Sequence, residues 1–366
     1  MNNKLKVVSL LLILCCTVML FFTGCSQDNT QSDQNNTKTV TDEGGNTVEL
    51  PDSITKVAIT PIPWASAMYA IDGSSKRIVS INPSAMAQYN KSFMKTMDPD
   101  FANISTGEIT KDFTINIESL LNLSPEVAFI WNDQTDEAEQ LKKVGITPVM
   151  LNYAENLDDL KKDIKLMGEV LDQNEKASTI IEYQDQTDEY FNNAAEKLKS
   201  VDQPKVLYLQ NSSLSVAGSK NINNTLLAMT GAQNAAGELD KKWAQVNMEQ
   251  IMAWDPDIIY LSNFDDTQPD DLYENKIEGQ DWSSIKAVKN HRVYKTPVGL
   301  LRWDAPCVET PLMLKWMAKI QQPDLFKDLD VKNDIKSYYK KILNYDLTDD
   351  DVNTILNTSV NGDVIN

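Results

Sequence analysis

The sequence predicts an α/β protein made of two Rossmann-like lobes with mainly parallel sheets, bridged by one long α-helix. Short apolar runs alternate with helical patterns over residues 39–155 and again over residues 204–325, as in successive βαβ units. The stretch from Asn116 to Ile130 recurs from Asn247 to Leu261, with Asn, Glu and Pro at matching places. An unbroken helical pattern separates the two regions. We therefore expect two equivalent lobes that close on a ligand.

The first 25 residues have the pattern of a secretory signal peptide. A positively charged start precedes an apolar run from Val7 to Phe22, which is too short for a typical membrane span. The run ends in Phe-Thr-Gly-Cys, which resembles a bacterial lipobox, although Leu is usual where Phe22 stands. We expect Cys25 to be lipidated, with palmitate among its acyl chains, and to anchor the protein to the outer face of the cell membrane. This face is extracellular, or periplasmic if the cell has two membranes. An uncleaved signal anchor is the alternative.

Residues 26–38 form a Gln/Asn/Asp/Ser/Thr-rich run without a large apolar side chain, which predicts a flexible tether. The formal net charge of the whole chain is −19. So acidic a protein is not expected to bind nucleic acid, or anionic lipid head groups by charge. The acidity itself is explained by solubility at an exposed surface.

Cysteine usage agrees with an exported protein that has no internal disulfide. Cys15 and Cys16 lie in the signal peptide and Cys25 is the expected lipid site, so Cys307 is alone in the rest of the chain. We expect Cys307 to be a buried, small apolar side chain.

Residues 39–155 are expected to form the N-terminal lobe. Four short apolar runs in this region are bounded by polar and turn residues, as buried strands are. These runs are Val57–Thr60, Ile78–Ile81, Val127–Trp131 and Pro148–Leu151.

Residues 156–203 are expected to be helical and to contain the bridging helix. No Pro or Gly occurs from Asn174 to Ser200, and the apolar residues in this stretch recur at helical spacing. Residues 204–366 are expected to form the C-terminal lobe, with terminal helices packed over residues 326–357. Its predicted strands are Val206–Leu209, Ile258–Leu261 and Val293–Lys295.

The lipobox, the opening T-V-T-D-E-G-G-N-T-V-E-L-P at Thr39–Pro51, the long helix and the two Glu-containing repeats occur in a characteristic order. In this order they resemble a substrate-binding lipoprotein of an ABC importer, of the helical-backbone (class III) type that captures iron–siderophore complexes, haem or cobalamin. The resemblance implies a catalytically inert, monomeric receptor with ligand held in the cleft and only small lobe closure. It also implies ABC permease and ATPase subunits as partners.

In that family an acidic residue on each lobe docks with arginines of the permease, and Glu118 and Glu249 match those positions. Each Glu stands two residues after an Asn that is suited to cap the start of a helix, so it is expected in the first turn of that helix. The helix dipole favours a carboxylate there. The alternative is that both residues only stabilise their helix termini, but this does not explain their equal placement in the two repeats.

Ligands of open parallel sheets bind beyond the carboxyl ends of the strands. The segments that follow the predicted strands therefore hold the candidate ligand residues, together with a tryptophan just before the second repeat. Four tryptophans, Trp64, Trp131, Trp243 and Trp303, are candidates for aromatic walls around a bulky, partly apolar ligand, and core packing is the alternative for each. Trp254, Trp282 and Trp316 lie in helical patterns and are interpreted as packing residues.

Polar candidates come from the same segments. Arg302 lies where the family's pocket loop falls, and its planar fork suits a carboxylate, hydroxamate or phosphate oxygen; a salt bridge to Asp304 is the alternative. Glu108 stands where some haem-binding relatives carry an axial Tyr, which weakens the haem interpretation. The remaining candidates are Asn132, Asn263, Met86 and Tyr89, with a core role equally open for the last two.

Missing patterns exclude several functions. The single His, His291, is expected to be exposed, so a His-rich site for a free divalent metal is excluded, and no cofactor is expected. No HExxH, GxSxG, Walker or GxGxxG pattern occurs. The expected ligand is a ferric siderophore or related iron complex, followed by a cobalamin-type corrinoid, then haem, then a molybdate-type oxyanion. The rival functions are an envelope-anchored hydrolase and an adhesin or scaffold.

Overall fold

The first lobe is built on a four-stranded, fully parallel sheet in the order β4-β3-β5-β6. A computed structural model describes residues 38–365, and the signal peptide, Cys25 and almost all of the expected tether lie outside this range. All five residues of β5 are buried, as expected for a strand covered on both faces. The strands of this lobe, including a separate antiparallel hairpin β1–β2, are β1 (Thr39–Thr41), β2 (Thr47–Glu49), β3 (Val57–Ile59), β4 (Ile78–Ile81), β5 (Val127–Trp131) and β6 (Thr147–Leu151).

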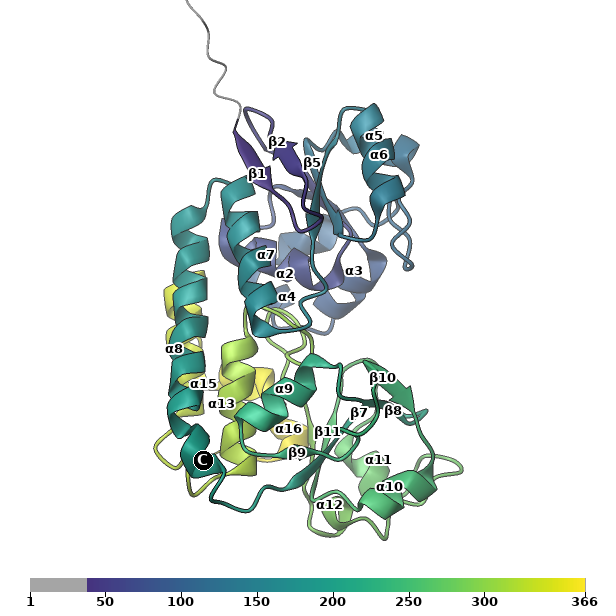
Figure 1. Ribbon diagram of the computed structural model, residues 1–366, viewed down its shortest axis with the longest axis vertical. Coiled ribbons are helices and arrows are strands. Elements are labelled where there is room, and N and C mark those ends of the chain that lie inside the picture. The colour runs from purple at the N-terminus through teal and green to yellow at the C-terminus, as the bar shows by residue number, and fades with distance from the viewer. Residues whose placement is uncertain (1–37, 366) are drawn as a thin grey trace, which may run out of the picture. The chain divides into compact units, whose positions relative to one another are not determined.

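Helices follow the strands of this lobe, because parallel neighbouring strands need crossover connections. Figure 1 shows the purple and blue elements of the lobe together, with α5 and α6 on one side of the sheet. The helices are α2 (Ile62–Asp72), α3 (Pro83–Tyr89), α4 (Met94–Met97), the 3₁₀ turn η1 (Pro99–Asn103), α5 (Ile117–Leu123), α6 (Thr135–Lys143) and α7 (Leu157–Val170).

The long helix expected from Asn174 to Ser200 is α8 (Asn174–Leu198), which has 25 residues. At 1.5 Å per residue it spans about 37 Å. It packs along α7 beside the first lobe and against α9, α13 and α14 beside the second. Figure 1 shows it running alongside both lobes. One continuous helix therefore connects the two sheets.

The second lobe contains a mixed sheet in the order β10-β8-β7-β11-β12, with β9 added to β7. The three predicted strands β7, β11 and β12 pair in parallel, whereas β8 and β10 are antiparallel. Only a short turn separates β7 from β8, and such a turn forces the chain to reverse direction. These strands are β7 (Lys205–Asn211), β8 (Ser215–Ala217), β9 (Gln233–Asn234), β10 (Trp243–Gln245), β11 (Ile258–Leu261) and β12 (Val293–Lys295).

The helices of the second lobe include the expected terminal group, which packs against α8 and α13. In Figure 1 these last helices are yellow-green to yellow. The helices are α9 (Ile222–Met229), α10 (Met248–Trp254), α11 (Pro269–Tyr273), α12 (Lys286–Lys289), α13 (Thr310–Gln321), α14 (Val331–Leu343), α15 (Asp349–Ile355) and α16 (Thr358–Asn361).

The sequence repeat corresponds to the same helix–turn–strand unit in each lobe, α5–β5 and α10–β11. The side chain of Asn116 accepts a hydrogen bond from the Ser119 N–H at 3.0 Å, and that of Asn247 accepts one from the Gln250 N–H at 2.9 Å. Both helices end in a left-handed residue, so the two copies begin and end alike.

Several expected core residues are buried. Cys307 is a free cysteine with an exposed fraction of 1%, and burial raises the pKa of its thiol. Trp316 is buried in α13 and Trp254 is half-buried at the end of α10. Trp282 is fully buried, as expected for a packing residue. It does not lie in a helix, however, but in the loop before α12, where its indole N–H donates to the Gln280 side chain.

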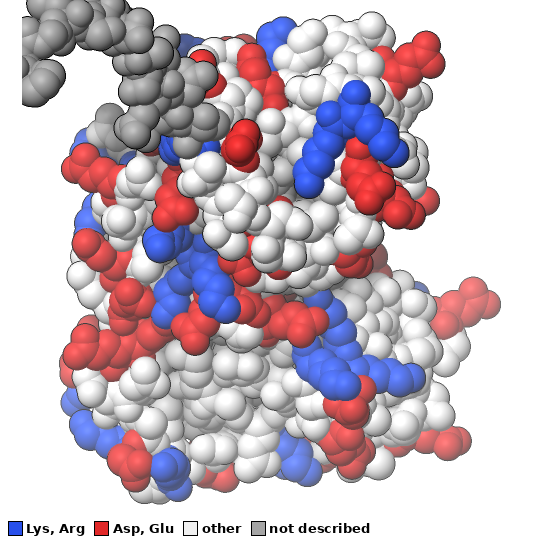
Figure 2. All heavy atoms as spheres, turned by 45° about the horizontal axis from the view of Figure 1, so that its top comes forward, with Lys and Arg blue, Asp and Glu red and all other residues white. Residues whose placement is uncertain are grey.

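The surface of the described chain carries both signs of charge. On the face drawn in Figure 2, acidic and basic side chains are interspersed over both lobes. None of the helices within residues 38–365 has the length and apolar character needed to cross a bilayer.

Candidate ligand-binding site

A cavity of about 230 Å³ lies between the two lobes, at the carboxyl ends of β5, β6 and β11. This is where open parallel sheets bind ligands. The first lobe contributes Ile62, Pro63, Phe113, Trp131, Tyr153, Ala154 and Glu155, and the second contributes Asn221, Ile222, Lys242, Trp243, Phe264, Leu301, Arg302, Asp304, Ala305 and Pro306.

Aromatic rings form a wall on each side of the cavity. In the first lobe Trp131 and Tyr153 are stacked with ring centroids 4.2 Å apart, and Phe113 meets Trp131 edge-on at 6.0 Å. In the second lobe Trp243 and Phe264 meet edge-on at 5.6 Å. Such walls offer flat apolar faces to a ligand from both lobes.

Two cationic side chains lie among these rings. The guanidinium carbon of Arg302 is 3.6 Å from the centroid of the Phe264 ring. The Lys242 ammonium, from the second lobe, is 5.4 Å from the centroid of the Tyr153 ring in the first lobe, so this cation–π contact joins the lobes.

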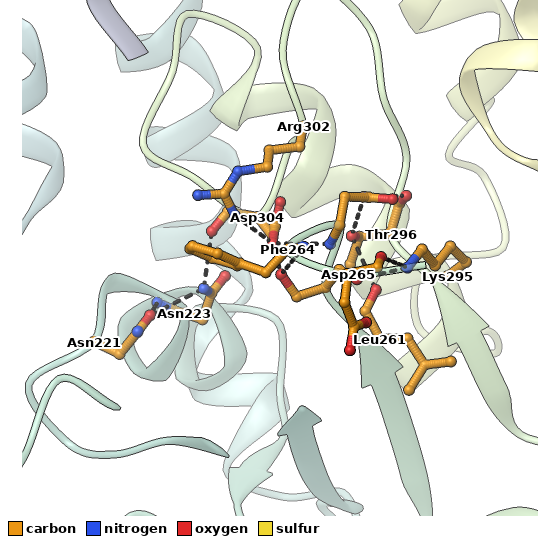
Figure 3. A network of polar contacts seen from close by, with 11 residues as sticks. Asn221, Asn223, Leu261, Phe264, Asp265, Lys295, Thr296, Arg302 and Asp304 are labelled. Carbon is orange, nitrogen blue, oxygen red and sulfur yellow. Dashed lines mark hydrogen bonds and ion pairs between the residues drawn. The ribbon is translucent and has the colours of Figure 1, made fainter. Parts of the chain in front are cut away.

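Arg302 also forms a salt bridge to Asp304, which is the alternative role that the sequence suggests for it. Its Nη1 is 2.8 Å from Asp304 Oδ2, and the Asp304 side chain is fully buried. The same carboxylate accepts from the Ser262 hydroxyl, and the Asn223 side-chain amide donates to the Asp304 backbone carbonyl at 3.2 Å. Figure 3 shows Asp304 beside the guanidinium of Arg302, with the Phe264 ring below them in this view. The guanidinium is therefore fixed in place at the cavity.

Phe264 is placed by a buried lysine at the end of β12. Lys295 is only 4% exposed, and its ammonium donates to the carbonyl oxygens of Ser262, Asp265 and Thr267 at 2.7, 3.0 and 2.9 Å. Burial lowers the pKa of Lys295. The ammonium (Figure 3) satisfies three carbonyl groups of the loop that carries Phe264, and so orders this loop.

A buried carboxyl group places Tyr153 in the opposite wall. Asp163 on α7 has no exposed surface and accepts from the Asn152 N–H at 3.0 Å, and burial raises its pKa to about 8. The Tyr153 hydroxyl donates to Asp133 at 3.0 Å. Burial, and then this carboxylate, raise the pKa of Tyr153 to about 12.

A second buried carboxyl group holds the segment that carries Arg302. Glu309 accepts from the N–H groups of Leu300 and Leu301 at 2.8 and 3.3 Å, and from the Tyr339 hydroxyl at 2.6 Å. Burial raises the pKa of Glu309 to about 7. A β-carbon at Gly299 would lie 1.9 Å from Glu309 Oε1, so only glycine allows this close approach.

Of the ligand residues predicted from sequence, the structure brings Trp131, Trp243 and Arg302 together at the cavity. It places two other predicted tryptophans elsewhere: Trp64 is 1% exposed and packs in the main core, and Trp303 is fully buried in that core. Pro63 and Arg302, which precede these tryptophans in sequence, do line the cavity. The sequence therefore predicts the correct segments, but not which side chains of each segment point into the cavity.

The polar candidates outside the cavity are each held by other side chains or by backbone. The buried Glu108 accepts from the hydroxyl groups of Ser80 and Ser105, Asn132 donates to Asn152, and Asn263 donates to the Thr296 carbonyl. Tyr89 stacks on Phe101 and donates to the Asp98 carbonyl, and Met86 packs against the core.

Sequence reasoning missed several residues that line the cavity. Tyr153 and Phe264 come two and three residues after strands β6 and β11, so a slightly longer reading of each following segment would have included them. Lys242 directly precedes the predicted Trp243, so including the neighbours of that tryptophan would have found it. Phe113 follows no strand, and nothing in the sequence singles it out. No group of three or more His, Cys, Asp or Glu side chains within residues 38–365 is arranged to hold a metal ion.

A family model described as "Periplasmic binding protein" matches residues 68–298, more than half of the chain. The chain is a member of the periplasmic binding protein family. This periplasmic binding protein is of the ABC-importer type and has the class III fold, with two lobes joined by one long helix. It is not an enzyme, because its relatives are solute-binding proteins.

Solved and curated relatives support this assignment. A periplasmic solute-binding protein from Veillonella parvula DSM 2008 has 47% sequence identity and a TM-score of 0.85, covering 89% of this chain and 98% of its own. The molybdate-binding protein MolA of Haemophilus influenzae is 25% identical over 82% of this chain and 90% of its own length. The high-affinity heme uptake system protein IsdE of Staphylococcus aureus is 24% identical over 53% of this chain and 68% of its own length.

Proposed function

We propose that this periplasmic binding protein captures an anionic metal chelate with flat faces, a ferric siderophore in the first place, and delivers it to permease and ATPase subunits. The single observation that carries the proposal is the pair of aromatic walls, Trp131–Tyr153 and Trp243–Phe264, with Arg302 and Lys242 placed on their rings. Aromatic faces suit the flat rings of a chelate, and the Lys242 ammonium suits its negative charge. The Arg302 guanidinium is already paired with Asp304, but its remaining N–H groups can donate hydrogen bonds to oxygens of the chelate.

A molybdate-type oxyanion is the second candidate. The similarity to MolA favours it. The cavity of about 230 Å³ also favours a small ligand, because pockets for drug-sized ligands measure about 300–1,000 Å³. Against it, Asp304 already neutralises Arg302. The same volume limits every candidate to a small ligand or to one that is only partly enclosed, so it favours a compact iron chelate over the large macrocycles of haem and corrinoids. The buried Glu108 is also not available to haem iron at the cavity.

A thermal-shift panel distinguishes these ligands. At a concentration 100 times its dissociation constant, a ligand of the folded state adds about 2.7 kcal/mol of stability, which raises Tm by several degrees. We expect this rise with ferric catecholate or hydroxamate siderophores, and none with molybdate, haemin or cyanocobalamin. A rise with molybdate alone would replace the chelate proposal by the oxyanion one.

A matched pair of tryptophan variants tests whether the ligand uses the aromatic walls. Trp243→Leu removes a cavity ring, and Trp254→Leu removes a half-buried ring of the same lobe that does not line the cavity. We expect the thermal shift produced by the ferric siderophore to fall in the first variant only. Equal shifts in both variants would contradict the assigned site.

The membrane attachment is part of the proposal. Lipidation of Cys25, which lies outside the described residues, would tether the receptor to the outer face of the cell membrane next to its permease. We expect a Cys25→Ser variant to leave the membrane fraction or to accumulate unprocessed, as measured by cell fractionation with immunoblotting. If the Cys25→Ser variant has the size of the mature protein and stays in the membrane fraction at the normal level, lipid anchoring is contradicted.

Docking to the permease is proposed for Glu118 and Glu249. Both side chains are exposed, and neither makes a hydrogen bond or ion pair with the residues that the structure describes. Their equal positions in α5 and α10 offer one free carboxylate on each lobe to a partner with cationic side chains.

A further inference from the structure

Leu121 in α5 and Met252 in α10 are large apolar side chains that point into solvent. Each is 39% exposed, and each stands three residues after the Glu of its repeat. A single exposed apolar side chain needs no explanation, because much of any protein surface is apolar. Two such side chains at the same position of two repeats require a common reason.

The local structure shows why these residues face outward. The preceding residues, Leu120 and Ile251, are 1% and 0% exposed and belong to the cores beneath α5 and α10. Successive residues of an α-helix are about 100° apart, so an anchored Leu120 or Ile251 turns the next side chain away from the core.

The same geometry groups the exposed apolar residue with the carboxylate. Residues three apart lie on one helix face, so Glu118 and Leu121 are neighbours, as are Glu249 and Met252. Each lobe therefore presents a patch of one carboxylate and one apolar side chain. We call Glu118 with Leu121 the first docking patch, and Glu249 with Met252 the second docking patch.

We propose that Leu121 and Met252 are contact residues of the permease interface, and that each inserts into an apolar socket flanked by a cationic side chain of the permease. The inference rests on the proposed docking of Glu118 and Glu249 and adds the apolar half of each contact. Charge complementarity favours this occupant, because two exposed carboxylates without partners among the described residues suit basic groups beside both sockets. The repetition on two lobes fits a partner that presents two equivalent sockets.

The test uses the full lipid-modified chain in detergent and the permease–ATPase complex of the importer in nanodiscs, with no ligand added. The variants are Leu121→Ser, Met252→Ser and their combination. We expect each single change to weaken binding roughly fivefold and both together roughly 25-fold, because the apolar area is lost independently at two sites. Biolayer interferometry measures these affinities.

The chain offers matched controls on both lobes. Val144 and Val360 are 38% and 41% exposed and lie outside the repeats, so Val144→Ser with Val360→Ser removes similar apolar surface elsewhere. We expect this control to bind the permease like the wild type. Thermal melts show that all the variants are folded.

Each outcome decides a separate point. Unchanged affinity for Leu121→Ser with Met252→Ser, while Glu118→Arg with Glu249→Arg abolishes binding, would overturn the apolar contacts and leave the carboxylate docking in place. Equal weakening by the Val144 and Val360 control would overturn the specific sockets. Full binding by the Glu→Arg pair as well would remove the docking proposal itself.

Discussion

Replacing Arg302 with methionine is expected to lower the free energy of unfolding by roughly 3–5 kcal/mol, because it leaves a buried charge without its partner. The Asp304 side chain is fully buried and lies 2.8 Å from the guanidinium. The Ser262 hydroxyl and the Asn263 N–H still donate hydrogen bonds to it, and the Lys295 ammonium acts on it only at a distance, because that ammonium donates to backbone carbonyl groups. The midpoint of urea denaturation, with the slope held constant, measures the loss.

A double variant separates the lost pairing from lost packing. Arg302→Met with Asp304→Asn removes both charges, and we expect it to recover much of the stability, since neutral replacement of a buried pair costs little. Lys336→Met provides a surface control, because its partner Asp349 is 89% exposed, and it should leave the midpoint nearly unchanged. Equal losses in the single and double variants would show that packing of the arginine stem, and not its charge, stabilises this site.

Stability is also expected to fall as pH rises from about 5 to about 8, in contrast to proteins stabilised by ionised carboxylates. Burial raises the pKa of Asp163 from 3.8 to about 8 and that of Glu309 from 4.5 to about 7. The folded state therefore holds more protons than the unfolded state over this range, and deprotonation favours unfolding. Each group contributes a slope of up to about 1.4 kcal/mol per pH unit.

Asp163→Asn isolates one of these two groups. Asparagine keeps an oxygen that can accept from the Asn152 N–H but has no proton to lose. We expect urea midpoints between pH 5 and pH 8 to decline less steeply in this variant than in the wild type, with the largest gain at pH 8. Carboxylates with lowered pKa, such as Glu126 and Asp257, are ionised in both states above pH 5 and do not contribute. A wild-type midpoint that is flat or rises over this range would contradict the protonated carboxyls.

Much of the fold follows directly from local sequence patterns. Strands β5, β11 and β12 begin and end at the predicted residues, because continuous apolar runs flanked by turn residues define strands buried on both faces. Helix α8 begins at the predicted Asn174 and runs unbroken, since this stretch contains no Pro or Gly to interrupt it. The short strands β8 and β10 were not predicted. They have three residues each and depend on pairing with β7 and with each other, which is tertiary information.

The site was predicted less completely than the fold, because a strand end locates a segment but not the directions of its side chains. Trp303 and Arg302 show the difference: they are adjacent in sequence, yet one is buried in the core and the other lines the cavity. Phe113 joins the aromatic wall only because its loop folds against Trp131, a contact between residues that are not neighbours in sequence.

The isolated cysteine of the second lobe makes the folded region suitable for optical sensing. Cys307 is buried and has a raised pKa, so it is expected to resist thiol-reactive dyes. Within residues 38–365, a cysteine introduced at Glu155, which is exposed and lines the cavity without belonging to either aromatic wall, would be the one accessible attachment point. A fluorophore attached there would lie at the entrance used by the cargo, and its emission would report occupancy without disulfide scrambling or background labelling.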